Sequence, residues 1–236
     1  MAPTRSLFFP IVLTTFLLSV DAVISLALVS SMVYFLQHYG GGPFIIAPPD
    51  GPRFLLAGEP ANLVVNQGHT ANAAGGTALI LVGFGGILAL SVEWHSREKR
   101  GKSSPAFYIW AVIVLLSFLL TMAALIYTFV ETSNTSGQVI HLAVAEANSA
   151  RRPYPDGRWT PENWYAAVLD LPLLRDEDRD KIGHNLNLMR GWRWNLVPLF
   201  ILGFVLLALV ALELWRQRRT GLQRVSTDEA FHGPSK

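Results

Sequence analysis

The sequence predicts an all-α polytopic membrane protein, a four-helix transmembrane bundle with a small extracytoplasmic subdomain made from two outer loops. Composition is the first reason: of 236 residues, 51% are hydrophobic and only 15% are charged, and the mean hydropathy is +0.33. The second reason is that the apolar residues fall into four long runs. A helix needs about 20 predominantly apolar residues to cross the hydrocarbon core of a bilayer. Each run meets that length, so we expect four spans.

The first span covers residues 7–35 and follows Arg5, as the apolar region of a signal peptide would. Such regions are only about 7–15 residues long, so we expect an uncleaved span. The second span covers 75–94 and is rich in small residues, which let membrane helices approach closely. Its expected helix-packing positions are Gly83, Gly85, Gly86 and Ala89, although glycine is also simply common in membrane helices. The third and fourth spans cover 106–130 and 194–215.

Outer loop 1, residues 36–74, contains a strong turn signal at Pro48–Pro52. The short apolar runs PFIIA and RFLLA flank this turn, so we expect a hairpin or two packed extended segments. A third apolar run, residues 63–65, is a candidate additional strand.

Outer loop 2, residues 131–193, carries helix signals. Thr160 precedes Pro161 and Glu162, which predicts a helix with a threonine N-cap, a proline at its first position and an acid in its first turn. This helix should stop near residues 171–172, and a second should begin at 175–178 and run directly into the fourth span. Residues 131–150 should continue the third span as a helix, with a break at Gly137. Because the chain has no cysteine, these short helices must be held by packing on each other, on outer loop 1 or on the bilayer.

Four tryptophans of outer loop 2 and its junction with the fourth span suit the membrane interface, where an indole keeps its N–H hydrated and its ring in an apolar environment. The same residues are alternatively a platform for carbohydrate or peptide, and thus a partner contact. They are Trp159, Trp164, Trp192 and Trp194.

The distribution of basic residues predicts the orientation. Ten of the 19 Lys and Arg residues lie in the N-terminal tail (1–6), the short loop 95–105 and the C-terminal tail (216–236), and outer loop 1 has only Arg53. Loops rich in Lys and Arg stay in the cytosol, and long loops weigh less in this rule. We therefore expect both termini in the cytosol of a protein of the secretory pathway or plasma membrane.

Asp21 is the polar residue that stands out, because it lies at the middle of the first span. An ionisable side chain at this depth is costly and is a functional hypothesis by default. Ser117 and Thr121 of the third span are its candidate hydrogen-bonding partners, as is Ser25 one turn further along the first span. The open alternatives are a structural hydrogen-bonding role and a role in transport.

Other chemistries find little support. The absence of cysteine excludes disulfides, thiolate metal sites and a cysteine nucleophile. The histidines show no metal-binding spacing, and the acidic run 176–180 lacks the pattern of an EF-hand loop. A net charge of +2 gives no reason to expect nucleic acid. We therefore expect no catalytic residues, cofactor or metal.

Two stretches, RWTPENWYAAVLDLP (158–172) and MRGWRWNLVPLFILG (189–203), resemble a group of uncharacterised four-span membrane proteins of filamentous fungi. The resemblance implies four spans and a fungal origin, and it carries over no functional residue. The likeness to tetraspanins and claudins is one of topology only, since those families brace their outer loops with disulfides.

Together these patterns favour a non-enzymatic membrane organiser or accessory subunit that recognises a membrane-protein partner, or a second copy of itself, through outer loop 2. The alternative is a small oligomeric transporter or channel that uses Asp21. A membrane enzyme ranks third.

Overall fold

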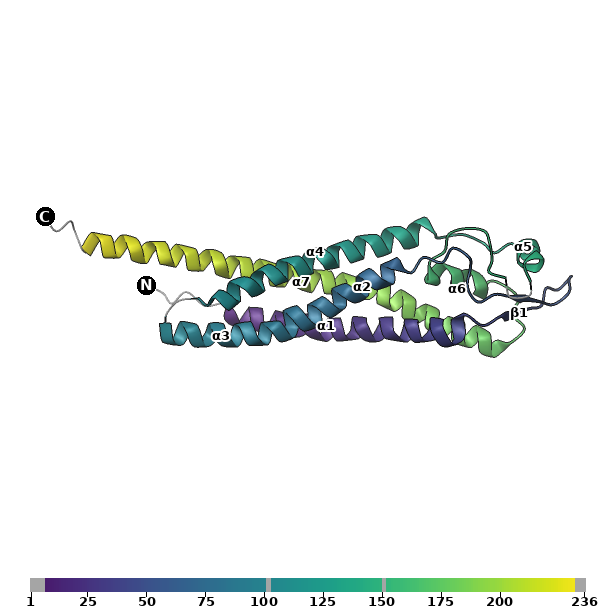
Figure 1. The fold of residues 1–236 in the computed structure, drawn as a ribbon, viewed down its shortest axis with the longest axis horizontal. Helices are drawn as coiled ribbons and strands as arrows, with labels where there is room; N and C mark the ends of the chain where they lie inside the picture. The colour runs from purple at the N-terminus through teal and green to yellow at the C-terminus, as the bar shows by residue number, and fades with distance from the viewer. Residues whose placement is uncertain (1–6, 101–102, 150–151, 232–236) are drawn as a thin grey trace. The chain divides into compact units, whose positions relative to one another are not determined.

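A computed structural model of the chain describes residues 7–100, 103–149 and 152–231 (Figure 1). Four of its helices are long and apolar enough to cross a membrane, which fits an all-α bundle and an integral membrane protein. They cover Phe8–Gly40, Asn66–Lys99, Pro105–Asn134 and Asp176–Arg219. The expected N-terminal tail 1–6, Lys102 and Lys236 lie outside the described residues.

The helical segments run further than the sequence predicted. Helix α1 (Phe8–Phe35) continues as the π-helical segment η1 (Leu36–Gly40). The second spanning helix consists of α2 (Asn66–Thr77), the π-helical η2 (Ala78–Phe84) and α3 (Gly85–Arg100). Residues 66–74, expected in outer loop 1, are therefore helical, and so are residues 95–100 of the expected basic loop. Burial of Gln67, Ala71 and Ala74 explains the early start, because this polar stretch has its own packed face.

The remaining elements largely follow the sequence signals. Helix α4 (Pro105–Asn134) is followed by a break in which Gly137 has a φ of 74°, and then by the short helix α5 (Leu142–Ala147). Helix α6 (Pro161–Leu169) is capped by Thr160, whose side chain accepts a hydrogen bond from the Asn163 N–H. Helix α7 (Asp176–Phe231) begins within the predicted range and runs through Gly191 without interruption.

The predicted hairpin is also present. Strands β1 (Phe44–Ile46) and β2 (Phe54–Leu56) pair antiparallel, with Ile45 opposite Leu55. The candidate third strand is not formed; Leu63 makes only an isolated bridge with Trp159.

The chain packs as two compact units. Unit 1 comprises residues 1–22, 76–119 and 199–236, and unit 2 comprises residues 23–75 and 120–198. In unit 1, the buried indole N–H of Trp110 donates to the Val82 carbonyl at 3.1 Å. The rings of Phe118 and Phe200 stack at 5.3 Å, and the ring of Phe8 lies 5.2 Å from that of Trp94. Aromatic contacts between helices therefore hold this unit.

Candidate functional site

The connecting segments of unit 2, residues 41–65 and 135–175, are joined by backbone hydrogen bonds. The N–H of Ala47 donates to the Pro172 carbonyl, and the N–H of Leu174 donates to Ile45, both at 2.9 Å. Further along, Val64 N–H donates to Trp159 O at 2.8 Å, and Trp159 N–H donates to Asn62 O at 3.1 Å. Two stretches far apart in sequence are thus joined by one hydrogen-bonding network. In a chain without cysteine, these bonds connect the segments that disulfides could otherwise link.

An aromatic cluster is buried within the same connecting segments. Tyr154, Trp159 and Trp164 are each at most 1% exposed. The indole rings of Trp159 and Trp164 meet edge to face at 5.2 Å, a favoured geometry for aromatic pairs. The indole N–H of Trp164 donates to Gly58 O at 2.7 Å, and that of Trp159 donates to Asp156 O at 2.8 Å. The cluster is therefore both apolar and fully hydrogen-bonded.

Two glycines are needed for this arrangement. A Cβ at Gly58 would overlap the backbone of Gly40 and Gly42, so the chain approaches itself too closely there for any side chain. Gly157 has a φ of 79°, in the left-handed region that other residues rarely adopt. At both positions the backbone geometry therefore requires glycine.

A polar contact docks α6 on the end of α4. The side-chain amide of Asn163 donates to the Thr132 carbonyl at 2.8 Å and to the Thr135 hydroxyl at 2.7 Å. Since Thr132 and Thr135 are buried, the contact satisfies groups that water does not reach. The connecting segments are thereby tied to a spanning helix.

Glu162 of α6 forms an ion pair with Arg193 of α7 at 3.1 Å and lies 3.9 Å from Arg190. Burial raises the pKa of the Glu162 carboxyl, and the two guanidinium groups offset part of that effect. A second ion pair joins Glu131 to Arg158 at 2.8 Å. These charges are paired within unit 2.

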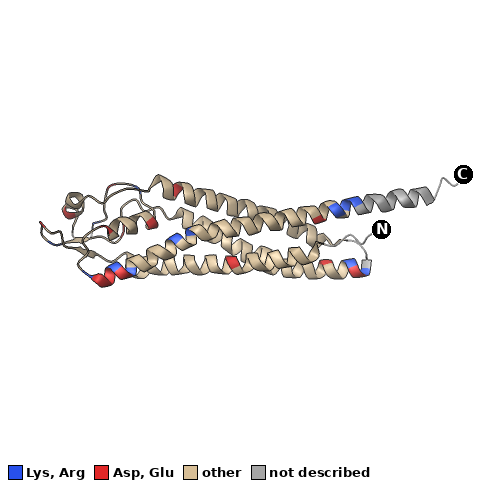
Figure 2. Ribbon diagram, turned by 180° about the vertical axis from the view of Figure 1, so that it is seen from behind, with Lys and Arg blue, Asp and Glu red and all other residues tan. Residues whose placement is uncertain are grey.

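The surface of the connecting segments and of the adjoining start of α7 has an apolar and a charged part. Val139 is 66% exposed, and Leu142, the first residue of α5, is 38% exposed. The first turns of α7 carry exposed Asp176, Glu177, Asp180 and Lys181. In Figure 2 these charges stand out against the uncharged stretches of the spanning helices. This surface is available for contact with another molecule.

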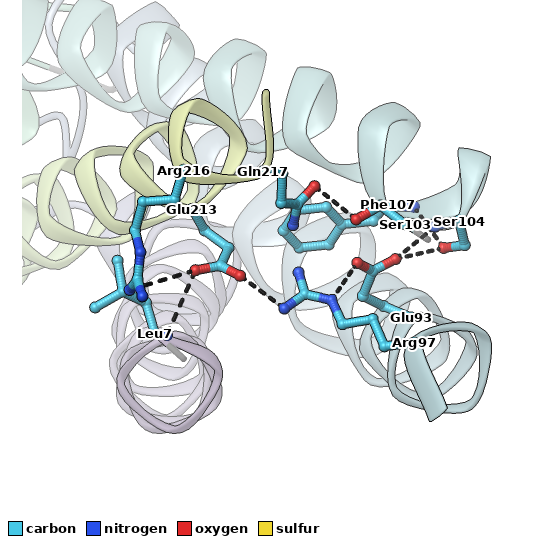
Figure 3. A network of polar contacts seen from close by, with 9 residues as sticks. All are labelled: Leu7, Glu93, Arg97, Ser103, Ser104, Phe107, Glu213, Arg216 and Gln217. Carbon is cyan, nitrogen blue, oxygen red and sulfur yellow. Dashed lines mark hydrogen bonds and ion pairs between the residues drawn. The ribbon is translucent and has the colours of Figure 1, made fainter. Parts of the chain in front are cut away.

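Unit 1 has a buried ion cluster, drawn in Figure 3. The guanidinium of Arg97 lies 2.6 Å from Glu93 and 2.6 Å from Glu213, which come from α3 and α7. The Glu93 carboxylate also accepts bonds from the N–H and hydroxyl of Ser104, at 2.7 and 2.9 Å. Ser104 in turn caps α4, because its hydroxyl accepts from the Phe107 N–H at 3.3 Å. The cluster therefore joins the ends of three helices.

The four tryptophans expected at an interface occupy different environments. Trp159, Trp164 and Trp192 are at most 4% exposed, and only Trp194 is exposed, at 59%. The first three have no ring surface to offer a bilayer or a partner, because packing within unit 2 covers them. Trp194 contacts the ring of Phe129 at 5.3 Å and remains accessible.

The three polar candidates of the long apolar helices are Asp21 in α1 and Ser117 and Thr121 in α4. Asp21 of α1 is half-buried in unit 1, where Ser117 of α4 is also buried. Thr121 is buried in unit 2, as is Ser25. All three candidates take part in polar or electrostatic interactions.

The small residues of the second spanning helix differ in how closely they pack. A Cβ on Gly86 would lie 3.1 Å from the Trp110 indole, and one on Gly83 would overlap the Ser19 hydroxyl. Ala89 is buried. Gly85 has only its own helix nearby, with Ile80 O at 3.8 Å.

Sequence reasoning missed the ion cluster, because Glu213 lies 116 residues from Arg97 along the chain. One local signal was usable: Glu93 and Arg97 are four residues apart, the separation of a helical ion pair. In the part of the chain that the structure describes, no group of three or more His, Asp or Glu residues is arranged to hold a metal ion.

Comparisons with known proteins give no family for this chain: no family model, curated protein or solved structure matches it.

Proposed function

We propose that this chain is a four-span integral membrane protein that acts, without catalysis, as an organiser or accessory subunit of another membrane protein. In this proposal both termini are cytosolic, and the connecting segments face the outside or a lumen. The connecting segments form the recognition surface for the partner.

The observation that carries the proposal is the preorganised state of the connecting segments. Their hydrogen-bonded backbone and the buried cluster of Tyr154, Trp159 and Trp164 hold a defined surface. A surface that is already ordered loses little conformational entropy on binding, which favours recognition of a partner. Val139 and Leu142 supply exposed apolar area at its edge.

The orientation is testable directly because the chain has no cysteine. Val139→Cys and Arg218→Cys each introduce a single thiol at an exposed position. With the protein at the cell surface, a membrane-impermeant maleimide should label Val139→Cys in intact cells, and Arg218→Cys only after permeabilisation. Labelling of Arg218→Cys in intact cells would reverse the proposed topology.

Partner recognition is tested by purification in mild detergent after cross-linking in the native membrane. The wild-type chain should recover one membrane protein in stoichiometric amount. Val139→Asp with Leu142→Asp should lose that partner, whereas Asp180→Ala with Lys181→Ala, also at exposed positions, serves as the matched control. The proposal fails if the wild type is recovered without a partner. It also fails if Val139→Asp with Leu142→Asp retains the partner while both double variants unfold at the wild-type temperature.

A second candidate function, ion or proton transport by an oligomer, is favoured by Asp21. This carboxyl lies half-buried within the apolar helix α1, which has no other charged residue. Protein reconstituted in vesicles should then show a flux that Asp21→Asn removes, while Asp50→Asn in the connecting segments leaves it unchanged. Absence of flux in the wild type removes this candidate.

A further inference from the structure

Unit 2 contains a cavity of about 110 Å³. Helix α1 and the η1 segment that follows it supply an apolar wall that includes Val29, Met32, Val33 and Leu36. Residues from α2, α4, α6, α7 and the connecting segments complete the lining. Val29 and Met32 are buried, whereas Val33 is 44% exposed. The lining residues Val65, His69 and Asn72 are also exposed. The cavity therefore has a closed apolar side, and one of its open sides lies at the surface of α1.

Among the buried polar side chains that line this cavity are Gln67 from α2 and Trp192 from α7, each 4% exposed. The amide nitrogen of Gln67 donates to Val64 O at 3.0 Å, which leaves its Oε1 as an acceptor. Within the described residues, neither Gln67 Oε1 nor Trp192 Nε1 has a hydrogen-bond partner. Trp159 and Trp164, by contrast, both donate to backbone carbonyls. Buried polar groups without partners are rare, and each needs an explanation.

The two atoms are chemically complementary to a single group. Trp192 Nε1 only donates, and Gln67 Oε1 only accepts. A hydroxyl group does both, since its oxygen accepts from the indole and its hydrogen is donated to the amide oxygen. The one charged residue in the lining, Glu162, is already paired with Arg193 at 3.1 Å. The site thus favours a neutral ligand.

We propose that this cavity binds the hydroxyl end of a lipid alcohol, with Trp192 and Gln67 as its hydrogen-bonding residues. The inference rests on the membrane embedding proposed above, because that embedding puts the exposed side of Val33 in contact with lipid.

The size of the cavity limits which part of the ligand enters. A cavity of about 150 Å³ holds one benzene ring. The space here, about 110 Å³, therefore takes the hydroxyl and a few adjoining carbons. The rest of the molecule passes Val33 and lies along α1, so the ligand has one polar end and a long apolar body. A sterol and a long-chain alcohol both have this chemistry.

The test uses the full-length protein in phosphatidylcholine nanodiscs, with a photoreactive sterol and a photoreactive long-chain alcohol as separate probes. Peptide mapping should place saturable labelling by at least one probe on residues 29–36, and the probe that labels identifies the source. An unlabelled alcohol of the same skeleton should compete at least tenfold better than its methyl ether, which accepts a hydrogen bond but cannot donate one.

Variants separate the polar contacts from the shape of the cavity. Trp192→Phe should weaken labelling about 5- to 10-fold, the effect of one lost hydrogen bond. Val33→Trp should fill the opening and abolish labelling, whereas Val23→Trp, at an exposed α1 position outside the cavity, is the matched control. Gel filtration and thermal unfolding of each variant check the fold.

Three results would overturn the inference. They are no saturable labelling, equal competition by alcohol and ether, and labelling that survives Val33→Trp. The first is the result expected if only water occupies the cavity. Failure here is distinct from failure of the proposed function: the maleimide experiment tests the membrane topology, and partner recovery is measured without any lipid probe.

Discussion

Substitution of Arg97 by methionine tests whether the ion cluster of unit 1 stabilises the fold. Arg97 faces two carboxylates at 2.6 Å, and the Glu93 and Glu213 side chains are 0% and 6% exposed. Removing one partner of a buried ion pair costs about 3–5 kcal/mol, because an uncompensated charge is left behind. Glu93 keeps its two bonds from Ser104, so we expect the lower end of that range, about 3 kcal/mol.

Glu213 should account for most of this loss. Without Arg97, its neighbours are the Leu7 N–H at 3.4 Å and the Arg216 guanidinium at 3.9 Å, both too distant for strong bonds. Adding Glu213→Gln to Arg97→Met should therefore recover part of the stability. The two substitutions would then show an interaction energy, as expected for residues in one network.

The measurement is the free energy of unfolding in mixed micelles, for the wild type, both single variants and the double variant. Lys99→Met is the matched control, because Lys99 is exposed on the same helix and loses a charge in the same way. Its effect should stay within about 0.5 kcal/mol. The reasoning is refuted if Arg97→Met costs no more than Lys99→Met, or if the two substitutions in the cluster add without interaction.

Three further predictions follow from packing, burial and capping. Gly86→Ala should destabilise the protein by about 1–3 kcal/mol through overpacking against the Trp110 indole, whereas Gly85→Ala should be nearly neutral in the same unfolding assay. Because burial raises the pKa of the Glu162 carboxyl above its ordinary value, that carboxyl contributes stability at low pH that is lost as pH rises from the ordinary pKa through the folded-state pKa. Unfolding measured against pH should show this loss in the wild type, and Glu162→Gln should remove it; an unchanged pH profile contradicts the assignment. Thr160→Ala should cost about 0.5–2 kcal/mol as a lost N-cap, and a thermal unfolding midpoint equal to that of the wild type would exclude the cap as a source of stability.

The sequence predicted the fold where the physical signal is local. A run of apolar residues longer than the bilayer core predicts a spanning helix, whatever its neighbours are. The Thr160 cap accepts a hydrogen bond from an N–H at the start of α6, and the acids that open α7 lie at the positive end of its helix dipole, so both effects are local. The hairpin of β1 and β2 follows from the turn between them.

Prediction failed where tertiary packing decides the structure. Residues 66–74 read as loop because they are polar, yet they are helical since Gln67 and Ala71 face a packed interior. The four tryptophans were expected at an interface, to which an indole is suited. Trp159, Trp164 and Trp192 are buried instead, whereas Trp194 is exposed. The indole N–H of buried Trp164 donates to the carbonyl of Gly58, 106 residues away in sequence. No local pattern identifies such an acceptor.

The connecting segments illustrate how a chain without cysteine orders long loops. Short helices are marginal alone, because nucleation is costly and few bonds repay it. Here α7 avoids a separate nucleation step, since its first turns continue directly into a spanning helix. Helix α6 then needs only to dock on structure that already exists, through Asn163 on α4 and Glu162 on α7. The hairpin is bonded in turn to Pro172 and Leu174. Each of these elements thus contacts another that is itself anchored, so the order of the connecting segments derives in part from the long helices to which they are bonded.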